Sequence, residues 1–190
     1  MKFFETIKIE NGRTKHLAYH NRRLERTLRT YYPDAIPIDL ADYIEPPKEG
    51  LWRCKVIYSD TIESIEYFPY TPRHIKTFKL IEADIDYDYK YLDRSAIDAL
   101  FAKRGEADEI IIVKNGLLTD TSIANIALFN GYEWHTPQTP LLPGTTRERL
   151  IKAGLLIPKK ILAKDLKHYK KIALLNAMIE FHVVNDFKML

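Results

Sequence analysis

The stretch from Lys90 to Arg147 contains side chains that together could bind one anionic ligand with a carbonyl group. A lysine amine attacks a carbonyl carbon when it is neutral, which burial or a cationic neighbour favours. Lys90 follows a tyrosine-rich segment and precedes a predicted helix, with Arg94 one helical turn further on. Aromatic shielding and the guanidinium would both lower the pKa of Lys90. An ordinary surface lysine is the alternative interpretation.

The segment Pro143-Gly144-Thr145-Thr146 begins a second predicted helix. The start of a helix offers unpaired backbone N–H groups and the positive end of the helix dipole, and both favour phosphate. The hydroxyls of Thr145 and Thr146 would add two donors. Simple capping of the helix by a threonine is the alternative.

Two polar residues, Asp120 and Asn125, lie in a largely apolar part of the chain. Asp120 is predicted at a strand end, where it could pair with a protonated ring nitrogen or simply terminate the strand. Asn125 lies between two apolar residues of the next predicted strand. Because a buried amide must be hydrogen-bonded, we expect Asn125 to tie two strands together.

The elements that position these residues fall into two groups. In the first group, alternation of apolar residues predicts three strands, at 3–9, 51–58 and 62–68. Asn11-Gly12 predicts a hairpin turn with a further strand to about Tyr19. Helical spacing of apolar residues predicts a helix at about 21–31. A short helix is also expected within 39–45. Pro69 and Pro72 mark the boundary, which gives a small N-terminal α/β lobe at 1–70.

The second group forms a larger C-terminal lobe, residues 73–190. Its predicted strands lie at 76–83, 109–113, 117–119, 124–129, 171–175 and 182–184. Its predicted helices lie at 93–104, 145–154 and about 163–168. The sequence therefore predicts an α+β fold in two lobes.

The composition narrows the classes of function. The net charge of +3 arises from 29 basic and 26 acidic residues without a basic block, so nucleic-acid binding has no support. The apolar runs are too short to span a bilayer and the start does not read as a signal peptide. The single cysteine, Cys54, lies in an apolar strand pattern and is expected in a core. A cytoplasmic protein is expected.

The order of the motifs resembles the class IV aminotransferases, the pyridoxal-phosphate enzymes of fold type IV. F-E-T-I at 4–7 and H-x-x-R-L at 20–24 match the amino-terminal lobe of that family. A-D-E-I-I-I-V-K-N-G-L-L-T-D, A-N-I-A-L and L-L-P-G-T-T-R match its second lobe, which has a barrel-like sheet. The resemblance covers nearly the whole chain.

The resemblance implies a role for individual residues. Lys90 matches the lysine that binds pyridoxal 5'-phosphate covalently and acts as the catalytic acid and base, and Arg23 matches an arginine that contacts the phosphate. Asp120 falls where the family has the glutamate facing the pyridine nitrogen. The phosphate-binding helix start and a second phosphate-contacting turn correspond to Thr145, Thr146, Asn176 and Ala177. No metal is implied.

Within the family, K-Y-L-D-R at 90–94 looks most like the 4-amino-4-deoxychorismate lyases, whereas the transaminases more often have asparagine where Arg94 stands. This implies elimination of pyruvate from aminodeoxychorismate to give 4-aminobenzoate, a step of folate biosynthesis. The resemblance also implies a homodimer whose two subunits build each active site together. An aminotransferase for branched-chain or D-amino acids stays open, as does a cofactor-binding member without turnover.

Two departures from the family pattern bear on these expectations. The chain begins close to F-E-T-I, so the usual first strand of the family and the loop after it are missing. Asp120 is one methylene shorter than the usual glutamate, so a backbone shift or a bridging water is expected at the ring nitrogen. Both departures leave cofactor binding expected and the substrate open.

Overall fold

A computed structural model describes residues 1–190 and divides them into two compact units. Unit 1 comprises Met1–Pro72 and Tyr89–Asp93, and unit 2 comprises Arg73–Asp88 and Arg94–Leu190. The chain therefore leaves unit 1 after Pro72, returns for five residues around Lys90, and leaves again.

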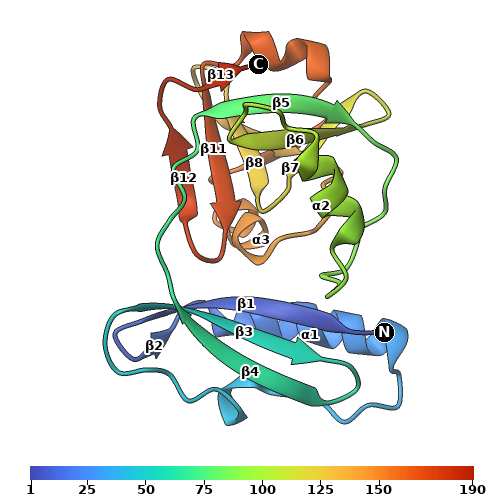
Figure 1. Cartoon of the computed structure of the whole chain (residues 1–190), viewed down its shortest axis with the longest axis vertical. Coiled ribbons are helices and arrows are strands. Elements are labelled where there is room, and N and C mark those ends of the chain that lie inside the picture. The colour runs from blue at the N-terminus through green and yellow to red at the C-terminus, as the bar shows by residue number, and fades with distance from the viewer. The chain divides into compact units, whose positions relative to one another are not determined.

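Unit 1 is a four-stranded antiparallel sheet with one long helix on it (Figure 1). The strand order is β2-β1-β3-β4. The elements are β1 (Phe3–Glu10), β2 (Arg13–Thr14), α1 (Leu17–Tyr31), the 3-10 turn η1 (Leu40–Asp42), β3 (Leu51–Tyr58) and β4 (Ile62–Pro69). Alternate residues of β1 and β3, among them Phe3, Ile7, Cys54 and Val56, are buried against the apolar stripe of α1. The core position of Cys54 is thus confirmed.

The start of α1 differs from the prediction of a strand to about Tyr19. β2 has only two residues and α1 begins at Leu17. His16 has a φ of 55°, a left-handed conformation that ends the extended chain. Leu17 packs against the same core as Leu24 and Leu28, so the apolar stripe of the helix extends one turn further back than predicted.

The segment Tyr89–Asp93 packs in unit 1, although it was predicted to belong to the C-terminal lobe, residues 73–190. The backbone N–H of Phe4 donates to the Lys90 carbonyl at 3.0 Å, and the N–H of Leu92 donates to the Lys2 carbonyl at 2.9 Å. The rings of Tyr89 and Tyr91 also pack on Phe3. Edge hydrogen bonding and aromatic packing, neither visible in local sequence, explain the difference.

Unit 2 is a nine-stranded mixed sheet with two helices of eight residues each (Figure 1). The main path is β10-β9-β8-β7-β6-β5-β13, and β11 pairs with both β8 and β12. Its strands are β5 (Thr77–Glu82), β6 (Glu109–Lys114), β7 (Leu117–Thr121), β8 (Asn125–Phe129), β9 (Trp134–Pro137), β10 (Ile157–Lys159), β11 (Lys171–Asn176), β12 (Glu180–Val184) and β13 (Lys188–Met189). Its helices are α2 (Ser95–Ala102), α3 (Thr145–Lys152) and the 3-10 helix η2 (Ala163–His168).

The central strands of unit 2 are almost wholly buried because both of their faces are covered. β6 and β8 contribute Ile111, Val113, Ile126 and Leu128 to the main core, which β11 and η2 complete. β7 is two residues longer than predicted and contains Asp120 within the strand instead of at its end. The short strands β9, β10 and β13 were not predicted.

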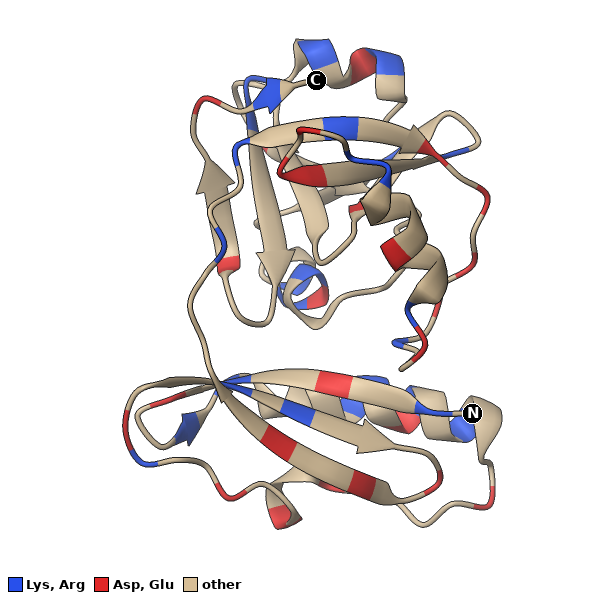
Figure 2. Cartoon of the chain, viewed as in Figure 1, with Lys and Arg blue, Asp and Glu red and all other residues tan.

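Lys and Arg positions are interspersed with Asp and Glu positions along the backbone of both units (Figure 2). No helix of the structure is long and apolar enough to span a membrane. No group of three or more His, Cys, Asp or Glu side chains is arranged to hold a metal ion.

Candidate active site

Asp120 is a buried carboxyl group in the middle of unit 2. β7 places it opposite Asn125 of β8, so that the two side chains meet across the strands. The Asn125 amide donates to Asp120 Oδ1 at 2.8 Å, and the backbone N–H of Leu142 donates to Oδ2 at 2.8 Å. Burial raises the pKa of Asp120 from 3.8 to about 7, because these neutral donors and the more distant charge of Arg147 offset only part of the desolvation.

Helix α3 begins beside this carboxyl group. Its first residue follows Gly144, which is extended at φ −73° and ψ 146° and provides no side-chain cap. The first hydrogen bond of the helix runs from the Glu148 N–H to the Gly144 carbonyl at 2.9 Å. The N–H groups of Thr145 and Thr146 therefore precede the hydrogen-bonded part of the helix, and both threonines are buried. Such a helix start can bind a phosphate.

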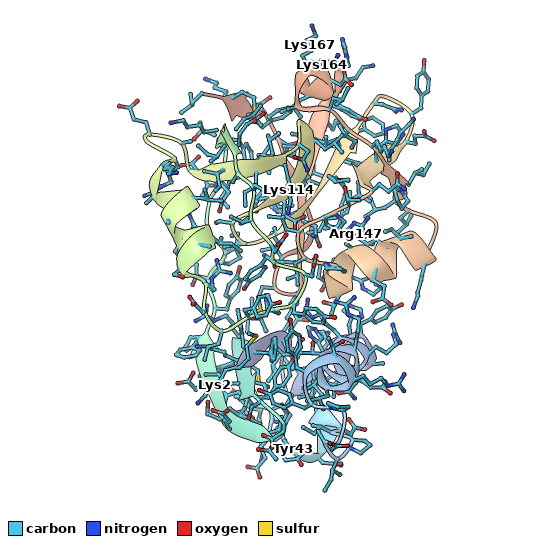
Figure 3. All side chains as sticks on the ribbon, turned by 90° about the vertical axis from the view of Figure 1, so that its right-hand side faces the viewer. Lys2, Tyr43, Lys114, Arg147, Lys164 and Lys167 are labelled. Carbon is cyan, nitrogen blue, oxygen red and sulfur yellow. The ribbon has the colours of Figure 1, made fainter.

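Arg147 lies in the first turn of α3 (Figure 3) and is hydrogen-bonded to the strand β9. Its Nη2 donates to the Pro137 carbonyl at 2.7 Å, and its Nε donates to Thr136 Oγ1 at 3.2 Å. Thr136 in turn donates to the Ile126 carbonyl of β8 at 2.8 Å. Burial lowers the pKa of Arg147, and the nearby Asp120 acts in the opposite direction. Arg147 thus stabilises the position of the helix start relative to the sheet.

Asn176 and Ala177 lie at the turn after β11. The Asn176 side chain accepts hydrogen bonds from the N–H groups of Met178 and Ile179 at 2.9 and 3.0 Å, which shapes the turn. Its Nδ2 donates to the Ile123 carbonyl at 3.3 Å, in the turn between β7 and β8. Unit 2 therefore brings Asp120, the start of α3 and the Asn176 turn together around the ends of β7, β8 and β11.

Arg23 lies in unit 1 and is held by Glu5. Arg23 Nε donates to Glu5 Oε1 at 2.7 Å, Nη2 lies 2.5 Å from Oε2, and His20 Nδ1 lies 2.6 Å from the same oxygen. All three side chains are buried. Burial alone would raise the pKa of Glu5, but Arg23 and His20 outweigh it and lower the pKa to about 2. Glu5 is therefore ionised, and it fixes the orientation of the guanidinium.

Lys90 belongs to the same unit. Its backbone carbonyl binds the start of β1, and its Nζ lies 4.5 Å from the centroid of the Phe4 ring. The Lys90 charge contributes to lowering the pKa of His20, after the larger effect of burial. Arg94, four residues later, belongs to unit 2, where its Nη2 donates to the Ser122 carbonyl at 2.9 Å.

Three charged residues of these clusters were not among the predicted site residues: Glu5, Glu109 and Arg147. All three lie within the quoted motifs, and the place of Glu5 on the apolar face of β1 was the available signal for that residue. Glu109 is fully buried at the start of β6, and burial raises its pKa. Its Oε1 accepts from the N–H of Ser122 at 3.3 Å, so it supports the turn after Asp120.

Comparison with known proteins agrees with this architecture. The family described as amino-transferase class IV matches residues 88–185. An uncharacterized protein of Haemophilus influenzae is 42% identical over 181 residues, which cover 92% of this chain and 96% of that protein. The crystal structure of a proposed 4-amino-4-deoxychorismate lyase from Haemophilus somnus is 38% identical, with a TM-score of 0.88, and the match covers 93% of this chain and 96% of that one.

A second similar structure shows the fold alone. It is the pyridoxal-phosphate-bound form of a hypothetical aminotransferase from Mycobacterium tuberculosis, 19% identical with a TM-score of 0.79, and the match covers 98% of this chain and 81% of that one. The predicted fold class is confirmed. The family match spans residues 88–185, and relatives at 42% and 38% identity are matched almost end to end, so this chain belongs to the class IV aminotransferase family.

Proposed function

We propose that this chain is a pyridoxal-phosphate-dependent lyase that releases pyruvate from 4-amino-4-deoxychorismate and leaves 4-aminobenzoate. Membership of the class IV aminotransferase family supports the enzyme class and the cofactor. The observation that carries the choice of reaction is the 38% identity, over 93% of the chain, to the proposed lyase of Haemophilus somnus. The K-Y-L-D-R sequence at 90–94 supports the same choice.

The residues of unit 2 fit the chemistry of this cofactor. Pyridoxal phosphate has an anionic phosphate, and the start of α3 offers backbone N–H groups without a side-chain cap, next to two threonines. It also has a ring nitrogen, and Asp120 is a buried carboxyl group whose two hydrogen-bond donors are neutral. A carboxylate has about four acceptor positions, so Asp120 keeps capacity for a further donor.

A positive charge at the ring nitrogen would compensate the buried carboxylate. Burial is the main reason why the pKa of Asp120 is about 7, so a cationic partner would lower this pKa and keep the group ionised. Asp120 would in this way hold the proton on the ring nitrogen. The shorter side chain of aspartate is set within β7, between fixed donors, and this supports its use in place of glutamate.

When bound, pyridoxal phosphate supplies an electron-accepting ring that stabilises negative charge on the carbon bearing the substrate amine. Lys90 would carry the cofactor through its Nζ and, once released, would remove the proton from that carbon. Breakage of the bond between the ring carbon and the enolpyruvyl oxygen would then make the six-membered ring aromatic, and the released enolpyruvate would take up a proton to become pyruvate. The lyase reaction needs no second substrate and no oxidant.

The phosphate contacts are proposed for Thr145, Thr146, the Asn176-Ala177 turn and Arg23. Glu5 binds Nε and Nη2 of Arg23 and so fixes the plane of the guanidinium. A guanidinium held in this way loses little side-chain entropy when it binds an anion. The same ion pair keeps Arg23 charged in a buried position.

A product assay tests the proposal. The purified protein with pyridoxal phosphate is incubated with 4-amino-4-deoxychorismate, with and without a 2-oxo acid, and pyruvate and 4-aminobenzoate are quantified. A lyase forms both products in equal amounts without the 2-oxo acid. Strict dependence on a 2-oxo acid would identify an aminotransferase instead, and bound cofactor with neither product would identify a member without turnover.

We also propose that the enzyme acts as a homodimer in the cytoplasm. The dimer follows from the family resemblance, in which two subunits build each active site. The single buried cysteine, Cys54, supports a reducing compartment because no internal disulfide is possible.

A further inference from the structure

One side-chain amide, that of Asn125, connects the two parts of unit 2 to which we assign cofactor recognition. Asn125 is buried at the start of β8, opposite Asp120 on one side and Leu175 on the other. Its Nδ2 donates to Asp120 Oδ1 at 2.8 Å and to the Leu142 carbonyl at 2.8 Å. An amide nitrogen has two N–H groups, so both of them are used.

These bonds close a ring. Leu142 accepts from Asn125 through its carbonyl and donates to Asp120 Oδ2 through its N–H at 2.8 Å. Asp120, Asn125 and Leu142 are therefore each bonded to the other two. The ring links the carboxyl group of β7 to the segment Leu142-Pro143-Gly144, which leads directly into α3.

The orientation of the amide is fixed by its partners. If its oxygen and nitrogen were exchanged, the oxygen would face a carboxylate and a carbonyl, and both contacts would be repulsive. In the observed orientation Oδ1 faces Gly144, and it lies only 2.1 Å from the position that a Cβ on Gly144 would occupy. The amide cannot swing aside without losing both of its donated bonds. Only glycine fits here, although its φ of −73° is open to any residue.

We infer that Asn125 is a positioning residue that holds the Asp120 carboxylate and the start of α3 in one fixed relation. The inference rests on the proposed function, because it makes the spacing between ring-nitrogen recognition and phosphate recognition a property of one amide. Asn125 touches neither group of the cofactor in this scheme and acts through Asp120 and Gly144. Removing its N–H groups therefore reduces the affinity for a ligand that has the ring nitrogen more than the affinity for a ligand that lacks it.

The test compares two ligands on apoprotein: pyridoxal phosphate and its analogue with carbon in place of the ring nitrogen. Dissociation constants are measured for the wild type, Asn125→Ala and Asn125→Leu, which nearly keeps the shape of the side chain but has no N–H group and no charge. Circular dichroism checks that each variant is folded, and Asn125→Leu serves if Asn125→Ala is not. The matched control is Asn130→Ala, because the Asn130 side chain also makes two hydrogen bonds, which it accepts from the N–H groups of Tyr132 and Glu133 at an exposed position.

The wild type and Asn130→Ala are expected to prefer pyridoxal phosphate over the analogue. Hydrogen bonds to charged groups are strong enough that both Asn125 variants should reduce this preference about tenfold or more. If Asn125 had a merely structural role, its substitution would weaken the binding of both ligands by the same factor. An unchanged preference would therefore overturn the inference. A wild type that binds neither ligand would overturn the proposed function and the inference with it.

The contact with Gly144 gives an independent check on the same scheme. Gly144→Ala should weaken the binding of pyridoxal phosphate because the methyl group displaces the Asn125 amide. Adding Asn125→Ala to the Gly144→Ala variant should then reduce the affinity by less than Asn125→Ala reduces it in the wild type. Two substitutions that act through one contact are not additive. Additive losses would contradict the assignment.

Discussion

Replacing Asp120 by asparagine should change the pH dependence of stability of the apoprotein. Burial raises the pKa of Asp120 from 3.8 to about 7, so folding favours the protonated form of this group. Its contribution to stability is fully present below the unfolded pKa and is lost as the pH rises through the folded pKa. A pKa that folding raises by about 3 corresponds to a contribution of roughly 4 kcal/mol to the free energy of unfolding, and roughly 3 kcal/mol of this contribution is lost between pH 5 and pH 8.

An asparagine side chain at this position would resemble the protonated acid and would lack this dependence. The free energy of unfolding of Asp120→Asn minus that of the wild type should therefore be roughly 3 kcal/mol larger at pH 8 than at pH 5. Urea unfolding of both apoproteins at the two pH values measures the difference. Taking the difference between the two proteins cancels the opposite effect of His20, whose pKa is lowered mainly by burial. Pyridoxal phosphate should abolish the advantage of the variant, since the ring nitrogen would compensate the wild-type carboxylate.

An equal stability difference at pH 5 and pH 8 would refute the reasoning. It would mean that Asp120 is ionised over the whole range, stabilised by its donors and Arg147 despite burial. The carboxylate would then need no cationic ligand, and the argument that Asp120 fits a protonated ring nitrogen would lose its electrostatic basis.

Three further predictions concern binding, the core of unit 1 and assembly. Thr146→Val and Arg23→Ala should each reduce the affinity for pyridoxal phosphate about tenfold or more. Arg29→Ala is the control, because Arg29 is an exposed arginine of the same helix as Arg23, and it should leave the affinity unchanged. Unchanged affinity in both Thr146→Val and Arg23→Ala would place the phosphate elsewhere. Glu5→Gln should destabilise the protein by about 3–5 kcal/mol in urea unfolding, because it leaves the buried Arg23 charge uncompensated, and a loss below about 1 kcal/mol would contradict the network. Light scattering of the cofactor-bound protein should give the mass of a dimer, and a fully active monomer would contradict the shared active site.

The parts of the fold that follow local patterns were predictable from sequence. Alternation along β1, β3 and β4 gave strands that the structure confirms within one residue at each end. β9 and β10 were not predictable in this way, because each has four residues or fewer, contains a proline and is stabilised by its pairing partner. The left-handed His16 that starts α1 is likewise a backbone conformation without a sequence pattern.

For the candidate site, the sequence supplied residue types and the fold supplied partners. The prediction that Asn125 ties two strands together is confirmed by its bond to Asp120. Its second bond, to Leu142, joins segments 17 residues apart and depends on the path of the loop before α3. The pairing of Lys90 with the start of β1 spans the whole of unit 1 in sequence, and no local signal encodes such a contact.

Borohydride reduction of the pyridoxal-phosphate-loaded protein, followed by peptide mapping, identifies the lysine that binds the cofactor. We predict a yellow protein in which reduction attaches the cofactor covalently to Lys90, and a folded Lys90→Ala variant that is neither labelled nor active. Attachment to another lysine, such as Lys103 or Lys114, would contradict the assignment of Lys90, and a protein that is not labelled at all would contradict pyridoxal-phosphate chemistry for this chain.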